Sequence, residues 1–274
     1  MRVGTVKEIK NHEYRVGLTP ESVHELTANG HEVWVESGAG EGIGADDEEY
    51  IAAGAAIKAT ASEIFAECEM VVKVKEPQPV ERAQLRKGQI LYTYLHLAPD
   101  ADQTADLIKS GGGVVGFNAA QMAVGLGANV TILDRDPAVL ERLDSHFEGR
   151  ARTLFSGRAA LAAEVAQADL VIGAVLVPGA AAPKLVTRDM LSTMQPGAVL
   201  VDVAIDQGGC FETAHATTHA DPTYVVDGIV HYCVANMPGA VARTSTYALN
   251  NVTLPHALRI ANLGWKAALK ANPH

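Results

Sequence analysis

The amino-acid sequence predicts an α/β protein built from two Rossmann-like, doubly wound domains. Short apolar segments alternate with segments of helical character along most of the chain, which favours a mostly parallel sheet covered by helices on both faces. The chain has 274 residues, of which 48% are hydrophobic and 20% charged, so it can supply two separate cores. A glycine cluster that begins at Gly111 marks the expected boundary.

Local composition predicts the elements of the first half. Thr19 is placed to cap a helix that begins with Pro20, a residue favoured at helix starts. β-Branched and aromatic residues indicate strands at residues 2–7, 32–36, 70–75 and 89–95. Helices are expected at residues 20–29, 46–53, 61–67 and 100–109.

The second half repeats this alternation. Helices are expected at residues 114–126 and 158–167, and strands at residues 129–134, 170–176, 198–204 and 224–226. Residues 247–269 have helical spacing, with Asn251, Pro255 and Gly264 as expected irregularities.

Charge and hydropathy exclude some classes of partner. The net charge of -10 disfavours nucleic acid and anionic membranes, because phosphate binding needs a basic surface. No apolar run is long enough to span a bilayer, and the first ten residues have no apolar signal segment. We therefore expect a cytoplasmic protein.

The cysteines and histidines do not predict a disulfide or a metal site. Cys68, Cys210 and Cys233 are scattered and odd in number, so we expect buried small apolar residues. His215 and His219 have the spacing of two ligands on one helix, but the segment around them contains Pro222 and several threonines. We interpret that segment as a loop and predict no metal.

The glycine cluster fits a dinucleotide-binding fingerprint. Gly111, Gly113 and Gly116 match G-x-G-x-x-G, in which the backbone approaches a pyrophosphate at a helix N-terminus. Asp134 ends the next predicted strand, where an acid accepts hydrogen bonds from ribose hydroxyls and favours NAD. Arg135 beside it weakens that preference.

One part of the fingerprint is not met. The glycines should follow a strand, but the preceding residues 105–110 have helical character. The alternative interpretation is a plain loop between two helices. The complete downstream half, with helix, strand and terminal acid, favours the fingerprint.

Several long segments resemble one known family. Residues 7–55 resemble the N-terminal domain shared by alanine dehydrogenases and the NAD(H)-binding subunit of proton-translocating transhydrogenase. Alanine dehydrogenases in particular are similar at residues 71–78 (VVKVKEPQ), 91–100 (LYTYLHLAPD), 111–136, 201–212 (VDVAIDQGGCFE) and 232–251. The similarity extends over essentially the whole chain.

The resemblance also implies an internal deletion. Family members carry several dozen further residues between the helix that ends near Ser110 and the glycine fingerprint, including the strand that leads into the glycine turn. They also continue past the position of His274. The dinucleotide-binding domain is therefore expected to lack its first strand, which explains the unmet part of the fingerprint.

The family resemblance implies that substrate and cofactor bind to two different domains. Residues 1–110 with 243–274 would form the substrate domain, and residues 111–242 the NAD-binding domain. The implied cofactor is NAD, the implied substrates are L-alanine and pyruvate, and the implied assembly is a homohexamer.

Three basic residues match family positions that contact the substrate. Arg15 would grip the substrate carboxylate through bidentate pairing. Lys75 would pair with the carboxylate and carbonyl, and the family motif selects it over Lys73, which shares its strand face. His96 would be the general acid–base, because imidazole titrates near neutrality.

Other matched positions surround the cofactor. Asp206 would help to activate water and order the nicotinamide ribose, and Asn236 would contact both substrate and nicotinamide. The remaining cofactor positions implied by the family, beside those of the fingerprint, are Val115, Ser156, Val175, Leu176 and Met237.

The expected reaction is the reversible, NAD-dependent oxidative deamination of L-alanine to pyruvate and ammonium. One alternative is a transhydrogenase-like NAD(H)-binding subunit, which would not need the pair Lys75 and His96. Another is a non-catalytic or partly folded remnant of the enzyme. A third is that the missing segment belongs to the protein but not to this sequence.

Overall fold

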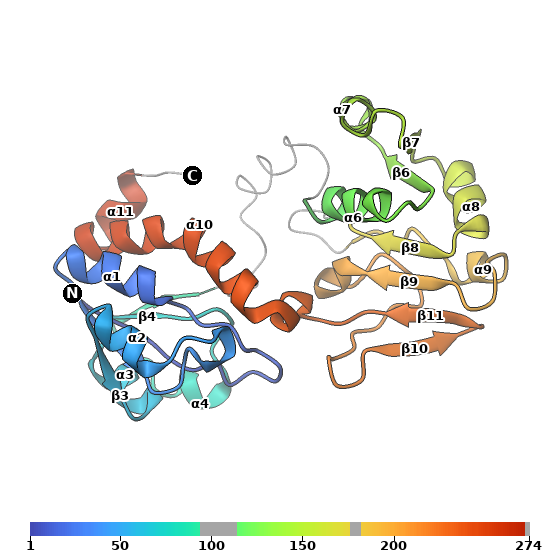
Figure 1. Cartoon of the computed structure of the whole chain (residues 1–274). Helices are drawn as coiled ribbons and strands as arrows, with labels where there is room; N and C mark the ends of the chain where they lie inside the picture. Colours follow the sequence, from blue (N-terminus) through green and yellow to red (C-terminus); the bar gives the residue numbers. More distant parts are fainter. Residues whose placement is uncertain (94–113, 176–181, 272–274) are drawn as a thin grey trace. The chain divides into compact units, whose positions relative to one another are not determined.

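The chain divides into two compact units, each described here by itself. The computed structural model describes residues 1–93, 114–175 and 182–271. The N-terminal unit comprises Met1–Leu97 and Pro238–His274, and the central unit comprises Ala98–Met237 (Figure 1). The predicted helix at residues 100–109 lies outside the described residues, as do His96, Gly111, Gly113 and Leu176.

The N-terminal unit contains a complete parallel sheet. Its five strands have the order β3-β2-β1-β4-β5, and every neighbouring pair is parallel. The strands are β1 (Arg2–Thr5), β2 (Glu32–Glu36), β3 (Ala55–Lys58), β4 (Met70–Val72) and β5 (Ile90–Tyr92). The helical segments are α1 (Pro20–Ala28), η1 (Glu41–Ile43), α2 (Asp47–Ala52), α3 (Ala61–Glu67), α4 (Pro79–Arg82), α10 (Ala242–Leu263) and α11 (Trp265–Ala271).

Helices cover both faces of this sheet, as the doubly wound prediction requires. Met70 and Val72 of β4 belong to a core shared with α1, α2 and α10. Val71, whose side chain points to the opposite face, packs instead with Ile64 and Phe65 of α3. The side chains of this one short strand therefore pack alternately into two separate cores.

Local signals placed the start of α1 and the irregularity at Gly264 correctly, and two other expected irregularities wrongly. The Thr19 side chain accepts a hydrogen bond from the backbone N–H of Ser22 at 3.2 Å, which confirms the predicted cap of α1. Gly264 ends α10 with a φ of 76°. The helix continues through Asn251 and Pro255, however, because proline removes only one donor and Ala257 and Ala261 hold this part of α10 in the core.

The central unit contains two sheets among its described residues. One pairs β6 (Val130–Asp134) with β7 (Ala151–Phe155) in parallel. The other has the order β10-β11-β9-β8 and is parallel except for the hairpin of β10 and β11. Its strands are β8 (Leu170–Gly173), β9 (Val199–Asp202), β10 (Thr223–Val226) and β11 (Ile229–Tyr232). The helical segments are α6 (Val114–Gly125), α7 (Pro137–Phe147), α8 (Arg158–Gln167), α9 (Arg188–Leu191) and η2 (Val203–Gln207), and η3 (Met237–Val241) begins at the last residue of the unit.

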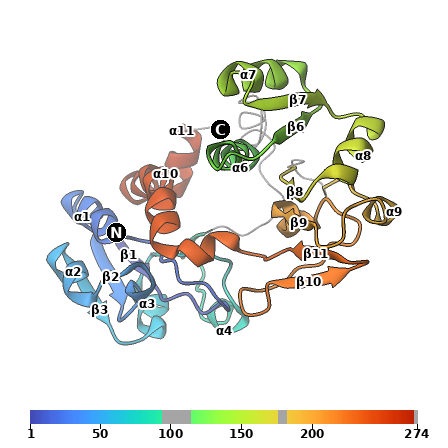
Figure 2. The ribbon, with the colours of Figure 1, turned by 45° about the vertical axis from the view of Figure 1, so that its right-hand side comes forward.

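The break between the sheets agrees with the predicted missing strand. A doubly wound dinucleotide fold has the order 3-2-1-4-5-6, in which the first strand lies between the second and the fourth. β7, β6, β8 and β9 fit the third, second, fourth and fifth positions. Within the described residues no strand joins β6 to β8, and α6 lies near both in two views (Figures 1 and 2).

The structure also bears on the state of the cysteines and on the apolar character of the helices. Cys68, Cys210 and Cys233 are buried and free, as expected, and burial raises the pKa of Cys68 and of Cys210 to about 12. None of the helices in the described ranges combines the length and apolar character needed to cross a bilayer.

The stability of the central unit should depend on His231. This side chain is fully buried in β11; its Nδ1 donates to the Ile229 carbonyl at 3.0 Å, and its Nε2 lies 2.7 Å from Thr213 Oγ1. Burial lowers the pKa of His231 below its ordinary value of 6.5. The unfolded chain therefore binds the proton more readily, so the free energy of unfolding is expected to fall as pH drops through this range.

Denaturant unfolding of the central unit at about pH 7.5 and about pH 5.5 measures this effect. One histidine can change the free energy of unfolding by at most about 1.4 kcal/mol per pH unit, and this change is the slope to be measured. His231→Gln should remove most of the slope. His24→Gln, on the exposed side of α1, is the control. An unchanged slope in His231→Gln would contradict the assignment.

Candidate active site

The predicted substrate-binding residues lie near the carboxyl ends of β1 and β4 in the N-terminal unit. These two strands are parallel neighbours. Arg15 lies in the connection between β1 and α1, and Lys75 follows β4 by three residues. In open parallel α/β sheets ligands bind at this edge, outside the carboxyl ends of the strands.

A close backbone approach brings the two segments together. A Cβ added to Gly17 would lie 2.5 Å from the carbonyl oxygen of Val72, so only glycine fits at this position. Gly17 is two residues from Arg15, and Val72 is three residues from Lys75. The fold therefore places the segments that carry both predicted residues side by side.

Arg15 is held in a fixed orientation by Glu13. The carboxylate of Glu13 accepts from Arg15 Nε at 2.8 Å and from Nη2 at 2.6 Å, a bidentate arrangement. The Glu13 side chain is fully buried and that of Arg15 is 10% exposed. The guanidinium is therefore held in a shielded place.

A buried ion cluster is centred on Lys73, two residues before Lys75. Lys73 Nζ donates to Glu8 Oε2 at 2.9 Å and to Glu81 Oε1 at 2.7 Å, and no side chain of the three is more than 3% exposed. Burial raises the pKa of Glu8, although Lys73 opposes the shift. Lys73 is therefore committed to this buried cluster.

Glu8 also ends the strand on which both lysines were predicted. Its Oε1 accepts from the backbone N–H of Val74 at 2.6 Å and of Lys75 at 3.4 Å. These donors would otherwise pair with a neighbouring strand, so β4 stops at Val72 instead of extending to residue 75. The Lys75 side chain is buried at this turn.

The predicted acid–base residue His96 lies outside the described residues. Thr93, the last described residue before it, donates from Oγ1 to the carbonyl oxygen of Lys75 at 2.8 Å. The chain that leads toward His96 is thus tied to the segment that carries Lys75.

In the central unit, two predicted cofactor residues are neighbours. Asp134 is the last residue of β6 and Ser156 directly follows β7. The backbone N–H of Ser156 donates to the carbonyl of Asp134 at 2.8 Å, and Asp134 Oδ1 accepts from the N–H of Asp136 at 2.9 Å.

Helix α6 brings the fingerprint close to the end of β8. A Cβ at Gly116 would lie 3.5 Å from Ala174 Cβ, next to Val175. Val115, also in the first turn of α6, is 48% exposed. Val115, Gly116 and Val175 therefore gather at the carboxyl end of β8.

The remaining predicted residues lie after β9 and β11. Asp206 is exposed in η2, and its neighbour Gln207 has a buried Oε1 with no hydrogen-bond partner in the described part of the chain. Asn236 is buried with a φ of 70°, and its carbonyl accepts from His219 Nε2 at 2.9 Å. Met237 is half-buried at the start of η3.

The histidine pair is in irregular backbone, as predicted. His215 stacks on Tyr224 with 3.7 Å between ring centroids, while His219 contacts Asn236 instead. In the ranges described, no three histidine, cysteine, aspartate or glutamate side chains are grouped to hold a metal ion.

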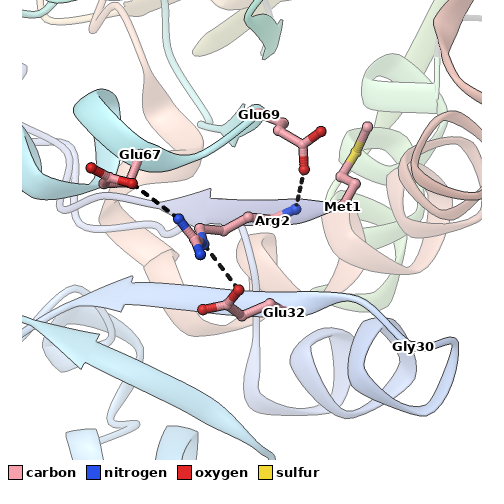
Figure 3. A pocket seen from close by; sticks show the side chains of 6 residues that line it. All are labelled: Met1, Arg2, Gly30, Glu32, Glu67 and Glu69. Carbon is pink, nitrogen blue, oxygen red and sulfur yellow. Dashed lines mark hydrogen bonds and ion pairs between the residues drawn. The ribbon is translucent and has the colours of Figure 1, made fainter.

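A pocket in the N-terminal unit lies at the opposite edge of the sheet. It is lined by Met1, Arg2, Gly30, Glu32, Glu67 and Glu69 (Figure 3). Arg2 pairs with Glu32 at 3.0 Å and Glu67 at 3.1 Å, and its N–H donates to Glu69. Because these residues lie at the amino ends of the strands, the pocket is separate from the candidate site.

Sequence reasoning missed the two glutamates that organise the site. Glu13 was not singled out, although an acid two residues before a predicted carboxylate-binding arginine is a usable signal. Glu8 gave no comparable signal, because its partner Lys73 is distant in the sequence.

The fold and site define a two-unit protein of Rossmann-like α/β sheets with basic side chains at the ligand-binding edge of one sheet. The chain belongs to the alanine dehydrogenase/PNT family. The model "Alanine dehydrogenase/PNT, N-terminal domain" matches residues 4–125, and "Alanine dehydrogenase/PNT, C-terminal domain" matches residues 98–274.

Similar proteins include named alanine dehydrogenases. One from Halomonas elongata is 48% identical over 338 residues, covering 100% of this chain and 91% of the relative. One from Mycobacterium tuberculosis is 42% identical, with shares of 100% and 91%. A solved L-alanine dehydrogenase is 42% identical with a TM-score of 0.91, covering 100% of this chain and 93% of that one. A transhydrogenase structure from Sinorhizobium meliloti is 27% identical with a TM-score of 0.82, covering 96% and 95%.

The comparisons agree with the predicted internal deletion. The alignment with the Halomonas relative spans 338 residues, whereas this chain has 274. The relative therefore carries several dozen residues with no counterpart here. The two family models overlap at residues 98–125, as expected for a chain shortened where the two domains join.

Proposed function

We propose that this protein is an NAD-dependent alanine dehydrogenase. It would convert L-alanine, water and NAD reversibly into pyruvate, ammonium, NADH and a proton. The observation that carries the proposal is the presence of Arg15 and Lys75 in adjacent segments at the carboxyl edge of a complete parallel sheet. The names of relatives at 42–48% identity support the same reaction.

Arg15 is proposed to bind the substrate carboxylate. A guanidinium offers several donors in a rigid plane, and Glu13 fixes that plane by bidentate pairing. A ligand carboxylate would therefore meet a donor that needs little reorganisation, which favours a defined orientation of Cα.

Lys75 and His96 are proposed to assist the steps at the amine and carbonyl. An ammonium at Lys75 would pair with the carboxylate and polarise the developing carbonyl as the imine is hydrolysed. His96 would take the proton from water as it adds to iminopyruvate, and would return it when ammonia leaves. Asp206 would share the activation of water.

The chemistry of the donor set in the central unit fits NAD. Asp134 and Ser156 end neighbouring strands, where a ribose would find acceptors and a hydroxyl, and Gln207 Oε1 is a buried acceptor after β9. NAD would accept the hydride from Cα of alanine. Asn236, Met237, Val175 and Leu176 are proposed to line the nicotinamide side, and Gly111, Gly113, Val115 and Gly116 the pyrophosphate.

The same proposal includes an assignment of the two domains, an oligomeric state and a cellular location. Residues 1–110 with 243–274 would hold the substrate and residues 111–242 the cofactor. We also propose a homo-oligomer, with a hexamer as the expected form, and a cytoplasmic location.

A second candidate is a non-catalytic remnant of this enzyme. The break between β6 and β8 favours it, because the strands that present Asp134 and Val175 belong to different sheets. Such a protein would retain the residues at the N-terminal unit's sheet edge but bind NAD weakly.

Mixing the purified chain with L-alanine and NAD at mildly alkaline pH, and following NADH by absorbance, tests the proposal. We expect alanine-dependent NADH formation in the natural chain. The His96→Ala variant should lose it while still binding NAD by calorimetry. Weak or absent NAD binding without turnover in the natural chain would support the remnant, and near-native turnover in His96→Ala would remove His96 from the mechanism.

A further inference from the structure

We propose that the central unit binds an extended apolar segment of a second polypeptide between β6 and β8. This segment would add one strand that pairs with both sheets and joins them. The proposal concerns an interaction surface and does not rest on the proposed activity.

The first argument is the pairing of the two strands. β6 pairs with β7 on one side, and β8 pairs with β9 on one side. Among the described residues neither has a second neighbour, although the fold places both next to a central strand. An unpaired strand edge offers a row of N–H and C=O groups to which another strand can bind.

Burial in the same molecule supports this interpretation. In the N-terminal unit, Met70, Val71 and Val72 of the interior strand β4 are all buried. In the central unit, no residue of β6 is buried, and Leu170 and Ile172 of β8 are 51% and 37% exposed. β6 and β8 therefore have the composition of interior strands but the exposure of edge strands.

Helix α6 adds apolar surface at the same place. It packs Phe117, Ala120 and Val124 against β6 and α7, and it also contacts β8. No residue of α6 is charged, yet Met122 is 62% exposed. Leu126, directly after the helix, is 87% exposed. Apolar helices without a polar face are normally buried, so this surface is suited to a partner.

These features specify the chemistry of the occupant. The strand pairs on either side, β6 with β7 and β8 with β9, are parallel, so we expect a parallel strand. A strand at the centre of such a sheet is covered on both faces and is rich in valine, isoleucine and leucine. The Halomonas relative carries residues that this chain does not, and its alignment is long enough to include such a strand.

The probe is a synthetic peptide with the residues of the Halomonas relative that have no counterpart in this chain. Hydrogen–deuterium exchange of the full chain is measured with and without it. We expect slower exchange of alternate amides in both β6 and β8, with a Kd below about 100 µM. A peptide with proline at successive strand positions cannot donate to β6 or to β8 there and should have no effect.

Two substitutions form a matched pair. Ile172→Lys places a charge on β8, and Val225→Lys does so on β10, the opposite edge of the same sheet, where Val225 is 64% exposed. We expect Ile172→Lys to weaken peptide binding at least about tenfold and Val225→Lys to change it less than about twofold.

Three results would overturn the proposal. The first is that the peptide fails to protect either strand. The second is that the proline peptide protects both strands as well as the original peptide does. The third is that the amides of both strands are already protected in the chain alone. The last result would show that a second copy or another part of this chain pairs with them.

Discussion

Lys73→Met is expected to lower the free energy of unfolding of the N-terminal unit by about 3–5 kcal/mol at neutral pH. Lys73 is the shared partner of Glu8 and Glu81, and all three side chains are essentially excluded from water. Methionine preserves much of the volume but leaves two carboxylates buried without their counter-charge. Denaturant unfolding followed by circular dichroism measures the loss.

An exposed ion pair is the matched control for this prediction. Lys7 pairs with Glu41 at 2.9 Å, with side chains 49% and 70% exposed. Lys7→Met should therefore change the free energy of unfolding by less than about 0.5 kcal/mol. The Lys73→Met loss should also shrink at acid pH, because burial already raises the pKa of Glu8 and protonation removes its charge. Equal effects of the two substitutions would contradict the structural role of Lys73.

Lys75→Met is expected to reduce turnover strongly. We expect kcat/KM for alanine-dependent NADH formation to fall by about 100- to 1,000-fold, the size found when one charge-stabilising donor is removed. The free energy of unfolding of the variant is measured as well, so that a loss of folded protein is separated from a loss of turnover.

Measuring both the free energy of unfolding and turnover for Lys73→Met and Lys75→Met distinguishes an effect on stability from an effect on catalysis at positions two residues apart. Turnover per folded molecule should be retained better in Lys73→Met than in Lys75→Met. Undiminished turnover in Lys75→Met, in a chain that is active before substitution, would remove Lys75 from the proposed site.

Most of the N-terminal unit could be predicted because its signals are local. The cap at Thr19, the apolar strand at residues 32–36 and the helix at residues 61–67 depend on neighbours in the chain. β3 was missed because its sequence AAIK has little strand character, and it forms by pairing with β2. In the central unit β7, β11 and α7 were missed, although Asp136 and Pro137 form a recognisable helix start.

The candidate site was predictable in its residues but not in its supports. Motif resemblance selected Arg15 and Lys75, while the fingerprint and strand pattern placed Asp134 at a strand end, where the structure has it. Their proposed roles still rest on that resemblance. The contacts that orient Arg15 and the Lys75 segment, through Glu13 and Glu8, depend on how distant segments pack.

The sequence by itself determined the α/β class, the family and the internal deletion, because composition, periodicity and motif spacing are properties of the chain alone. Only the tertiary structure decided that Lys73 belongs to a buried ion cluster, where β4 ends and how the deletion divides the second sheet. These outcomes depend on partners far apart in the chain: Glu8 and Lys73 are separated by 65 residues yet meet at 2.9 Å. In such a contact the attraction between the two buried charges offsets the cost of removing both from water, which no local pattern of residues records.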